Sequence, residues 1–503
     1  MNIATSLTLN ANRHPDKMAI TCEERVYSYK ELNEEVNRFA NGLLQLGFDK
    51  GDKVAIFMKN SDHFVIAFFA IIKAGLVAVP VNFRLTVQET SYIVEQSDTV
   101  AVICDKEFEQ TVSEAGKGIA NMKHVIVHSA AEHEGNLSWN QVKSQNAQEP
   151  KVLVLITDDA EILYTSGTTG LPKGALFDHQ RLISVAISYT LCAGLSKDDR
   201  MLYLAPLFHS AQLNGILVTS ILLGISSVIH RDFHPVRVLE DVERYKPTYF
   251  FGVPIMYNAI LQVPTAGNYD LSSVKACMYG AAPMAPGLIE GAMKLFKTDQ
   301  FYNFCGLTEA GPGGVYLTPE GHKNKLGAGG KAMFLFNVRV VNDNMEDVQP
   351  GEIGEFIMKG ETIMKEYYRN PEATQKTFVD GWLLTGDLAT IDTDGFITVV
   401  DRKKDMIISG GENIYSVEVE QVLNSYPAIL EAATIGLPDE KWGEVVVAVI
   451  VPKEGATIDE EDLASYCRER IAGYKIPKKF LYKEALPRNT SGKILKYQLR
   501  ESL

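Results

Sequence analysis

The chain has 503 residues, of which 46% are hydrophobic and 22% are charged, an ordinary composition for a globular protein. Its formal net charge is −14, from 49 basic and 63 acidic residues. This acidic balance argues against general binding to nucleic acids, because a phosphate backbone requires a dense cationic surface. It does not exclude a local basic pocket for a nucleotide ligand.

The six cysteines are scattered and show no zinc-ligand spacing, which favours reduced core residues and a cytoplasmic location. The N-terminus has no apolar segment typical of a signal peptide. The longest apolar stretch, 64–81, is interrupted by Lys73, Gly75 and Pro80. Because crossing a bilayer takes about 20 apolar residues, we expect no transmembrane segment, with peripheral membrane contact left open.

The first two hundred residues show strands that alternate with helices. Ser28 and Glu31 form the pattern of a capping box, and the apolar residues that follow predict a helix ending at Gly47. A buried helix is predicted at 64–72. Short apolar runs predict strands at 54–57, 76–81, 100–104, 125–127 and 162–164. This alternation indicates a large N-terminal domain of doubly wound, mostly parallel α/β subdomains.

From about residue 331 the pattern changes. Apolar runs at 338–341, 354–358 and 396–400 are separated by Asn-, Asp- and Gly-rich turns, which predicts a small antiparallel β-barrel region. The charged tetrapeptide 401–404 follows, and we place a domain boundary there. Residues 405–503 have their own apolar run and helix, so they are expected to form a small α+β domain.

The strongest functional signal directly follows the predicted strand at 162–164. It reads Thr165, Ser166, Gly167, Thr168, Thr169, Gly170, Leu171, Pro172, Lys173 and Gly174. Glycines let the backbone approach a ligand and expose successive N–H groups, while the hydroxyls and the lysine add donors, so this segment predicts a polyphosphate-binding loop. A Walker loop is excluded, because its lysine precedes Ser or Thr and here Gly174 follows Lys173.

This string resembles the signature of the adenylate-forming superfamily of acyl-CoA synthetases, luciferases and peptide-synthetase adenylation domains. Further motifs follow in the order of that family: Gly280-Ala281-Ala282-Pro283, Gly306-Leu307-Thr308-Glu309, Thr385-Gly386-Asp387, Asp401-Arg402 with Lys404, Gly410-Gly411-Glu412-Asn413, and 487–493. The resemblance covers nearly the whole chain and is nearest to bacterial fatty-acid–CoA ligases. It implies an AMP-binding domain at 1–400, a hinge at 401–404 and a mobile C-terminal domain at 405–503.

The resemblance implies that ATP, Mg²⁺ and CoA serve to convert a carboxylic acid into its CoA thioester through acyl-AMP. Glu309 and Thr165 would hold Mg²⁺, which prefers oxygen ligands. Asp387 would accept the ribose hydroxyls, and Cys305 stands where the family usually has an aromatic residue on the adenine. The other implied ATP-binding residues are Ser166, Gly167, Thr168, Thr169, Gly170, Lys173, Gly280, Ala281, Ala282, Gly306, Thr308, Arg402 and Lys493.

Lys493 is the implied catalytic lysine, acting together with Glu309, Thr308 and His209. A carboxylate that attacks the α-phosphate brings two anions together, and a lysine at the attacking oxygen neutralises charge in the transition state. The C-terminal domain would then rotate about Lys404 to admit CoA.

The implied CoA-binding residues are Gly410, Gly411, Trp442, Tyr474 and Lys478. An aromatic face beside a cation suits the CoA nucleotide. Packing of Trp442 in the core of the small domain is the alternative interpretation.

Residues 206–210 resemble the entry of the acyl pocket. His209 stands near the position where amino-acid-activating relatives have an aspartate that pairs with the substrate ammonium group, and no residue adjacent to it in sequence is acidic. Small and apolar residues follow at 214–217 and 253–256. Because a buried charge without a partner is costly, the sequence predicts a medium- or long-chain fatty acid. A satisfied core histidine is the alternative for His209.

Several other functions stay open. One is an aryl-acid or o-succinylbenzoate–CoA ligase, and another is a domain that loads a carrier protein. A non-catalytic nucleotide- or lipid-binding protein on the same fold is disfavoured, because binding alone would not need Lys493. The expected partners are the acid, ATP and CoA and no nucleic acid, and a homodimer is left open.

Overall fold

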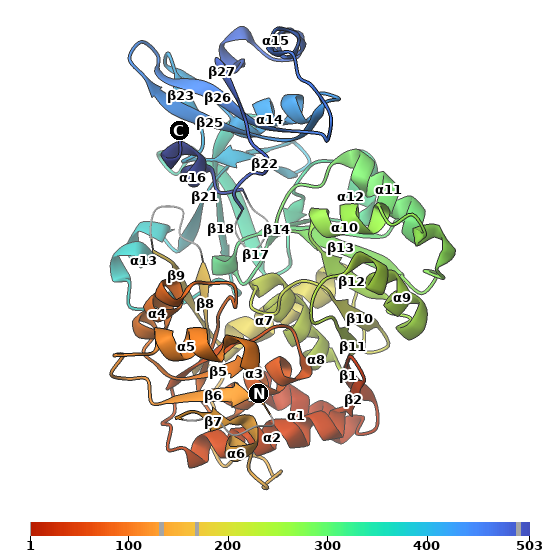
Figure 1. Cartoon of the computed structure of the whole chain (residues 1–503), viewed down its shortest axis with the longest axis vertical. Coiled ribbons are helices and arrows are strands. Elements are labelled where there is room, and N and C mark those ends of the chain that lie inside the picture. The colour runs from red at the N-terminus through yellow and green to blue at the C-terminus, as the bar shows by residue number, and fades with distance from the viewer. Residues whose placement is uncertain (1, 130–134, 166–170, 489–493) are drawn as a thin grey trace. The chain divides into compact units, whose positions relative to one another are not determined.

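The computed structural model of the protein describes residues 2–129, 135–165, 171–488 and 494–503. These residues fall into two compact units (Figure 1). Unit 1 comprises Met1–Asn337 and Lys359–Leu383, and unit 2 comprises Val338–Met358 and Leu384–Leu503. Within the described ranges, every helix is too short or too polar to cross a membrane.

Unit 1 contains an eight-stranded sheet in the order β19-β9-β8-β4-β3-β5-β6-β7. Its strands are β3 (Lys53–Phe57), β4 (Val77–Pro80), β5 (Thr99–Asp105), β6 (His124–His128), β7 (Leu137–Ser138), β8 (Asp159–Thr165), β9 (Lys173–Asp178) and β19 (Glu366–Tyr367). The central pairs, from β8 through β4, β3 and β5 to β6, are parallel. By contrast, β8 and β9 are antiparallel, and Thr165 pairs with Lys173. The predicted phosphate loop therefore connects these two strands.

A second sheet of unit 1 has nine strands in the order β16-β15-β14-β13-β12-β10-β11-β1-β2. The strands are β1 (Met18–Cys22), β2 (Arg25–Ser28), β10 (Arg200–Tyr203), β11 (Ser226–Ile229), β12 (Tyr249–Gly252), β13 (Ala276–Gly280), β14 (Phe301–Gly306), β15 (Gly314–Leu317) and β16 (Lys331–Ala332). The run from β1 to β14 is parallel, and β15 and β16 add antiparallel edges. The predicted α/β class is confirmed.

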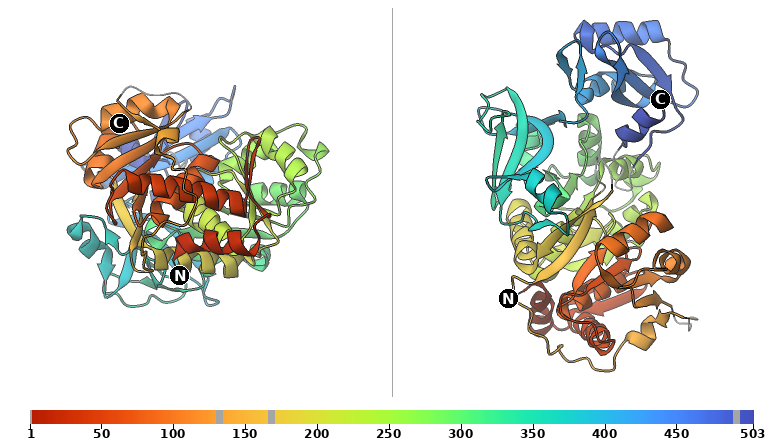
Figure 2. Two further views of the ribbon diagram at one scale, coloured as in Figure 1. Left: turned by 90° about the horizontal axis from the view of Figure 1, so that it is seen from below. Right: turned by 90° about the vertical axis from the view of Figure 1, so that its left-hand side faces the viewer.

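The helices of unit 1 begin where the sequence places caps. Ser28 and Glu31 form a complete capping box at α2 (Tyr29–Gln45), and Ser61 caps the buried α3 (Asp62–Lys73). Helix α2 packs beside α1 (Ile3–Arg13), as Figure 2 shows. The others are α4 (Val87–Gln96), α5 (Glu109–Ala115), α6 (Trp139–Val142), α7 (His179–Ala193), α8 (Thr219–Leu223), α9 (Pro235–Tyr245), α10 (Pro254–Leu261), α11 (Pro286–Phe296), α12 (Pro319–Asn324) and α13 (Pro371–Thr377).

Shorter turns complete unit 1. They are the 3₁₀ turns η1 (Lys106–Phe108), η3 (Ala266–Asn268) and η4 (Thr308–Ala310), and the π-helix η2 (Ala211–Val218). A π-helix has i→i+5 hydrogen bonds and is uncommon in proteins, where it often marks a functional segment. Both η2 and η4 carry residues of the candidate site.

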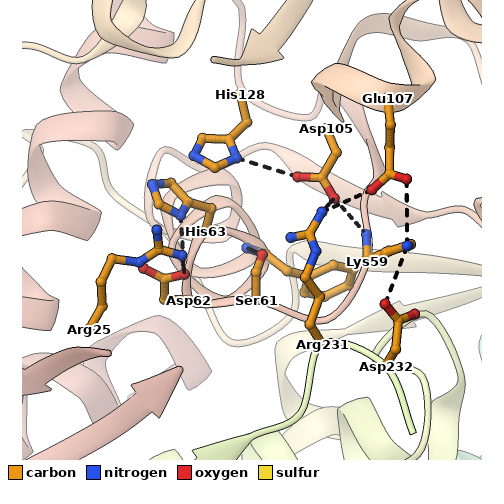
Figure 3. Close-up of polar contacts among 11 residues, drawn as sticks. Arg25, Lys59, Ser61, Asp62, His63, Asp105, Glu107, His128, Arg231 and Asp232 are labelled. Carbon is orange, nitrogen blue, oxygen red and sulfur yellow. Dashed lines mark hydrogen bonds and ion pairs between the residues drawn. The ribbon is translucent and has the colours of Figure 1, made fainter. Parts of the chain in front are cut away.

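A polar junction connects the two sheets of unit 1 (Figure 3). It comprises Arg25, Asp62, His63, Asp105, His128 and Arg231. The carboxylate of Asp62 is fully buried and lies 2.6 Å from Arg25 Nη2 and 3.1 Å from His63 Nδ1. The rings of His63 and His128 overlap, with centroids 3.7 Å apart. Since Arg25 belongs to one sheet and Asp62 follows a strand of the other, the junction fixes the two sheets against each other.

Unit 2 has two antiparallel regions. In the first, β21 (Trp382–Ile391) pairs antiparallel with β22 (Ile397–Arg402), beside β18 (Ile353–Gly360) and β17 (Phe336–Val341). The first two residues of β21 belong to unit 1, where they pair with β20 (Phe378–Val379). The second sheet consists of β23 (Ile407–Ser409), β24 (Glu412–Ile414), β25 (Ile429–Asp439), β26 (Gly443–Pro452) and β27 (Lys479–Tyr482). The helical segments are α14 (Ser416–Asn424), α15 (Glu460–Arg468), η5 (Gly473–Lys475) and α16 (Lys496–Glu501). The α+β character predicted for residues 405–503 is confirmed.

Candidate functional site

Glu309 is the centre of a cluster of oxygen atoms in unit 1. It lies in η4, directly after β14, and its Oε1 is 3.3 Å from the hydroxyl of Thr165 at the end of β8. Tyr367 of β19 donates its phenolic hydrogen to the same Glu309 oxygen at 2.7 Å. The amide of Met364 donates to the backbone oxygen of Glu309 at 2.8 Å. Ends of strands from both sheets therefore bring these groups together.

Lys173 and Tyr367 add a cation and a phenol to this cluster. The Lys173 ammonium lies 4.3 Å from the centroid of the Tyr367 ring, a cation–π contact. Burial, and next the negative charge of Glu309, raise the pKa of Tyr367 far above its usual value. The phenol therefore stays protonated and can only orient the carboxylate. Sequence reasoning missed Tyr367, because it lies 58 residues after Glu309.

The donor set fits a magnesium ion. It consists of one carboxylate and one aliphatic hydroxyl, both oxygen ligands, from Glu309 and Thr165. Within the described part of the chain, no group of three or more His, Cys, Asp or Glu side chains could hold a metal by itself. Mg²⁺ is commonly bound by one or two carboxylates together with substrate phosphates, so a sparse set of this kind suits it.

The predicted adenine-edge loop begins where β13 ends at Gly280. A Cβ added to Gly280 would lie 2.4 Å from the backbone oxygen of Phe304 on the neighbouring strand, so only glycine fits there. Ala281 has a left-handed backbone, with φ of +67°, an uncommon conformation for a residue with a side chain. Ala281 and Ala282 are both exposed.

Cys305 is half-buried on β14 next to Gly306. A Cβ added to Gly306 would lie 1.9 Å from the backbone oxygen of Gly313, which explains the glycine. The preceding Phe304 points into the core and stacks on Tyr189 with centroids 4.6 Å apart. Because successive side chains of a strand point to opposite faces, the Phe304 ring does not replace an aromatic residue at Cys305.

On the predicted acyl side, His209 is half-buried next to Phe208, and its buried Nε2 has no hydrogen-bond partner among the described residues. Burial, and next the charge of Arg84, lower the pKa of His209 to about 4, so the ring is uncharged at neutral pH. The following residue, Ser210, lies with its Oγ 3.2 Å from Thr308 Oγ1. The structure thus brings the acyl-side segment to the residue beside Glu309.

Behind this segment lies an acidic residue that the sequence analysis missed. Glu161 of β8 is fully buried, and its Oε1 accepts a hydrogen bond from Asn214 of η2 at 2.8 Å. Burial raises the pKa of Glu161 to about 8. Glu161 and Asn214 are 53 residues apart in the sequence, so an analysis of residues adjacent in sequence could not detect their contact.

In unit 2, Asp387 and Arg402 form an ion pair across two strands. They are direct partners in the register of β21 and β22, and Asp387 Oδ1 lies 2.5 Å from Arg402 Nε. The adjacent Asp401 is buried and accepts a hydrogen bond from the hydroxyl of Ser416 at 2.8 Å. The predicted hinge residue, Lys404, is exposed. The residue after it, Asp405, forms an ion pair with Arg500.

The predicted CoA-binding residues lie on exposed parts of unit 2. Gly410 and Gly411 have φ of +61° and +88°, and a Cβ on Gly410 would lie 2.8 Å from the Trp442 ring. Trp442 is 45% exposed and Tyr474 is 44% exposed, and Lys478 is also exposed. This exposure argues against the alternative in which Trp442 packs in the core.

Six residues of the predicted site lie outside the described residues. They are Ser166, Gly167, Thr168, Thr169, Gly170 and Lys493.

Comparison with known proteins places the chain in a family. The model of the AMP-binding enzyme family matches residues 7–368, and that of the AMP-binding enzyme C-terminal domain matches residues 418–493. The chain belongs to the AMP-binding enzymes. Both matches contain residues that the sequence analysis had singled out, Glu309 in the first and Trp442 in the second.

This AMP-binding enzyme has similar relatives along nearly its whole length. It is 38% identical to feruloyl-CoA synthase of Amycolatopsis sp over 490 residues, which cover 97% of this chain and 96% of that protein. It is 36% identical to long-chain-fatty-acid–CoA ligase FadD13 of Mycobacterium tuberculosis over 483 residues, or 94% and 92% of the two chains. The structure of o-succinylbenzoate coenzyme A synthetase from Bacillus subtilis, in complex with ATP and magnesium ion, matches with a TM-score of 0.87 at 32% identity, covering 98% of this chain and 99% of that one.

These relatives agree on the class of reaction and differ in the acid. The AMP-binding enzyme is an adenylate-forming acid–CoA ligase. The predicted superfamily is thereby confirmed.

Proposed function

We propose that this AMP-binding enzyme joins a medium- or long-chain fatty acid to CoA, using ATP and Mg²⁺, through an acyl-AMP intermediate. The buried and uncharged acyl-side segment is the observation that carries this proposal. In η2, the side chains of Leu213, Ile216 and Leu217 are fully buried. His209 is uncharged, and the pKa of Glu161, raised to about 8, leaves that residue neutral near pH 7. A substrate ammonium group would therefore lack a counter-ion here, which supports an acid without an amino group.

Glu309 and Thr165 are the residues that we propose hold Mg²⁺. When bound there, the ion would neutralise phosphate oxygens of ATP. Tyr367 fixes the Glu309 carboxylate by its hydrogen bond, and Lys173 adds positive charge beside it. Thr308, whose hydroxyl lies 3.2 Å from that of Ser210, is placed to connect the phosphate side with the acyl side. These contacts support electrostatic stabilisation as the main role of this cluster.

Residues of the C-terminal part have separate proposed roles. Asp387, held by Arg402, would accept the ribose hydroxyls of ATP. Lys493 would neutralise charge during attack on the α-phosphate, a role that rests on the sequence resemblance. Trp442 and Tyr474, which are exposed, would meet CoA. We further propose that 401–404 is a hinge between an N-terminal domain of 1–400 and a mobile domain of 405–503.

A panel of acids tests the proposal directly. The purified chain is incubated with ATP, Mg²⁺, CoA and one acid at a time, and both pyrophosphate and the CoA thioester are measured. Octanoate and palmitate are expected to give the highest kcat/KM, with no pyrophosphate release from free phenylalanine. Turnover of amino acids, or of aryl acids alone, would overturn the choice of a fatty acid.

An aryl acid is the second candidate. Tyr189 lies against Gly215 of η2, where an added Cβ would be 2.7 Å from the ring, and Tyr189 also stacks on Phe304. Both rings are buried, so they form an aromatic layer behind η2, which would favour a flat acid on its other side. One relative, which is 38% identical, is named feruloyl-CoA synthase, and this name also supports an aryl acid. Ferulate and o-succinylbenzoate therefore belong in the panel.

A further inference from the structure

Glu161 and Asn214 form a buried pair of side chains with an unusual balance of donors and acceptors. Asn214 Nδ2 donates to Glu161 Oε1 at 2.8 Å. The other two atoms, Glu161 Oε2 and Asn214 Oδ1, are buried and have no hydrogen-bond partner among the described residues. An ionised carboxylate and an amide oxygen are both acceptors. They can satisfy each other only if the carboxyl carries a proton.

We propose that Glu161 is protonated in the working enzyme and, through Asn214, is a positioning residue for the acyl-side segment η2. The carboxylic acid and the carboxamide then pair at both ends. Asn214 Nδ2 donates to Glu161 Oε1, and the Glu161 hydroxyl donates to Asn214 Oδ1. Both side chains are 0% exposed, as a neutral pair can be without the cost of burying a charge.

The surroundings of Glu161 agree with a neutral carboxyl. Burial raises its pKa to about 8, against the smaller lowering effect of the hydrogen bond from Asn214. Its partners across the sheet are the apolar Ala78 of β4 and Phe177 of β9. Neither β4 nor η2 has a titratable side chain. The titratable side chains of β8, β9 and α7, besides Glu161, are Asp159, Tyr164, Lys173, Asp178, His179, Arg181, Tyr189 and Cys192.

These neighbouring groups offer Glu161 no ion pair. Arg181 is paired with Asp178, and Lys173 lies over the Tyr367 ring. Burial lowers the pKa of His179 to about 4, so this residue is uncharged at neutral pH. None of them is among the groups that shift the pKa of Glu161. The Glu161 carboxyl therefore has no cationic partner among these groups, and a bound proton removes its negative charge instead.

The position of the pair explains why it matters to the reaction. Glu161 and Thr165 are four residues apart on β8, so their side chains point to the same face of the sheet. Asn214 lies four residues after Ser210, whose hydroxyl lies beside that of Thr308. Thr308 precedes Glu309, which contacts Thr165. The contact between Glu161 and Asn214 is therefore a second link between η2 and β8, in addition to the one that runs through Thr308 and Glu309. Together the two links position η2 against the strand that carries Thr165.

Glu161→Gln is the decisive variant, because glutamine keeps a donor and an acceptor for Asn214 but cannot ionise. Infrared difference spectra of the wild-type chain against this variant should contain the carbonyl band of a protonated carboxyl at pH 7. That band should disappear as the pH rises through about 8. A carboxylate band already present at pH 7 would overturn the proposal. This experiment needs no substrate, so it is independent of the proposed function.

The positioning role is tested by activity, and this part rests on the proposed function. With the best acid from the panel, Glu161→Gln should retain kcat within about threefold at pH 7. Asn214→Leu, which removes the amide, should lower kcat/KM for the acid by about tenfold, as expected for one lost buried hydrogen bond, and leave the KM for ATP unchanged.

The pH profile separates a role in the reaction from a role in folding. The ratio of wild-type to Glu161→Gln activity should fall as the pH rises through about 8, because only the wild-type chain ionises there. A constant ratio, or an equal loss of acid and ATP affinity in Asn214→Leu, would overturn the positioning role. If no acid in the panel is turned over, the proposed function fails, while the infrared result stands.

Discussion

Tyr367 donates a hydrogen bond of 2.7 Å to the Glu309 oxygen that also faces Thr165. The phenol is contributed by β19, a two-residue strand far along the chain from both partners. A hydrogen bond to a charged acceptor typically contributes about 1.5–3 kcal/mol. Tyr367 therefore determines where the proposed metal-binding carboxylate points before ATP arrives.

Replacing Tyr367 with phenylalanine should weaken the use of Mg²⁺. Loss of the hydrogen bond leaves Glu309 free to rotate, so we expect kcat/KM for adenylation to fall roughly tenfold or more, in line with the energy of such a bond. A magnesium titration of pyrophosphate release measures this effect. Tyr368→Phe is a matched control, because Tyr368 donates instead to Asp98 at 3.0 Å. Equal magnesium curves for both variants would contradict the role of Tyr367.

Trp442→Ala should affect the second half-reaction alone. The indole is 45% exposed and lies against Gly410, and base–aromatic stacking contributes about 1–3 kcal/mol. The KM for CoA should rise about tenfold, on the scale of that stacking energy, while acyl-AMP formation without CoA stays unchanged. Tyr482→Ala, which removes another aromatic side chain that is 44% exposed in the same unit, serves as the control. A change in adenylation of equal size would argue for a structural role of Trp442.

Lys493→Ala tests the proposed chemistry of the first step. If the lysine neutralises charge in the transition state, the variant should lose several orders of magnitude in acyl-AMP formation and bind ATP almost normally. Thioester formation from chemically supplied acyl-AMP should survive. Retained adenylation with loss of only the CoA step would show that Lys493 has a different role.

The polar junction predicts how stability depends on pH. Burial acts to raise the pKa of Asp62, but the hydrogen bond with His63 and the ion pair with Arg25 outweigh it and hold the pKa well below its usual range. A depressed pKa adds stability above the unfolded value of about 3.9 and loses it as the pH falls below that value. Asp62→Asn should therefore unfold at lower urea than the wild type at pH 7, with a gap that closes below about pH 4, the unfolded pKa of aspartate.

Asp232→Asn is the control for that experiment. Its side chain is 59% exposed and pairs with Lys59 at 3.3 Å at the edge of the same region (Figure 3). Exposed pairs contribute about 0–1 kcal/mol, so its unfolding curve should stay near that of the wild type throughout. A gap for Asp62→Asn that is constant down to pH 3 would show that its carboxylate is not held ionised by the junction.

The elements that the sequence predicted well depend on contacts between near neighbours. Ser28 and Glu31 are three residues apart, and the capping box they form follows from a local rule. The phosphate-binding role of Thr165 to Gly174 was also inferred from one short string, and it stays a prediction. The strands around it could be located from their apolar runs, although the antiparallel pairing of β8 with β9 was not specified by those runs.

The residues that the sequence did not reveal depend on distant contacts. Glu161 meets Asn214 across 53 residues, and Tyr367 meets Glu309 across 58. A search for acidic residues adjacent to His209 in the sequence therefore missed Glu161. This residue lies near the acyl-side segment because of the place of β8 in its sheet. Such partners depend on the register of strands, which a single sequence does not fix without knowledge of the neighbouring strands.

The direct pairing of Thr165 with Lys173 has a consequence for how such enzymes diversify. Both ends of the glycine- and threonine-rich segment are anchored by the backbone ladder of a hairpin, independently of the side chains between them. The backbone pairing of Thr165 with Lys173 therefore holds Thr165 at its place beside Glu309. Insertions within β8 or β9 are different, because a slip of one residue would turn Glu161, Leu163 and Thr165 to the other face of the sheet. Selection on this region should accordingly resist any change in the length of the two strands.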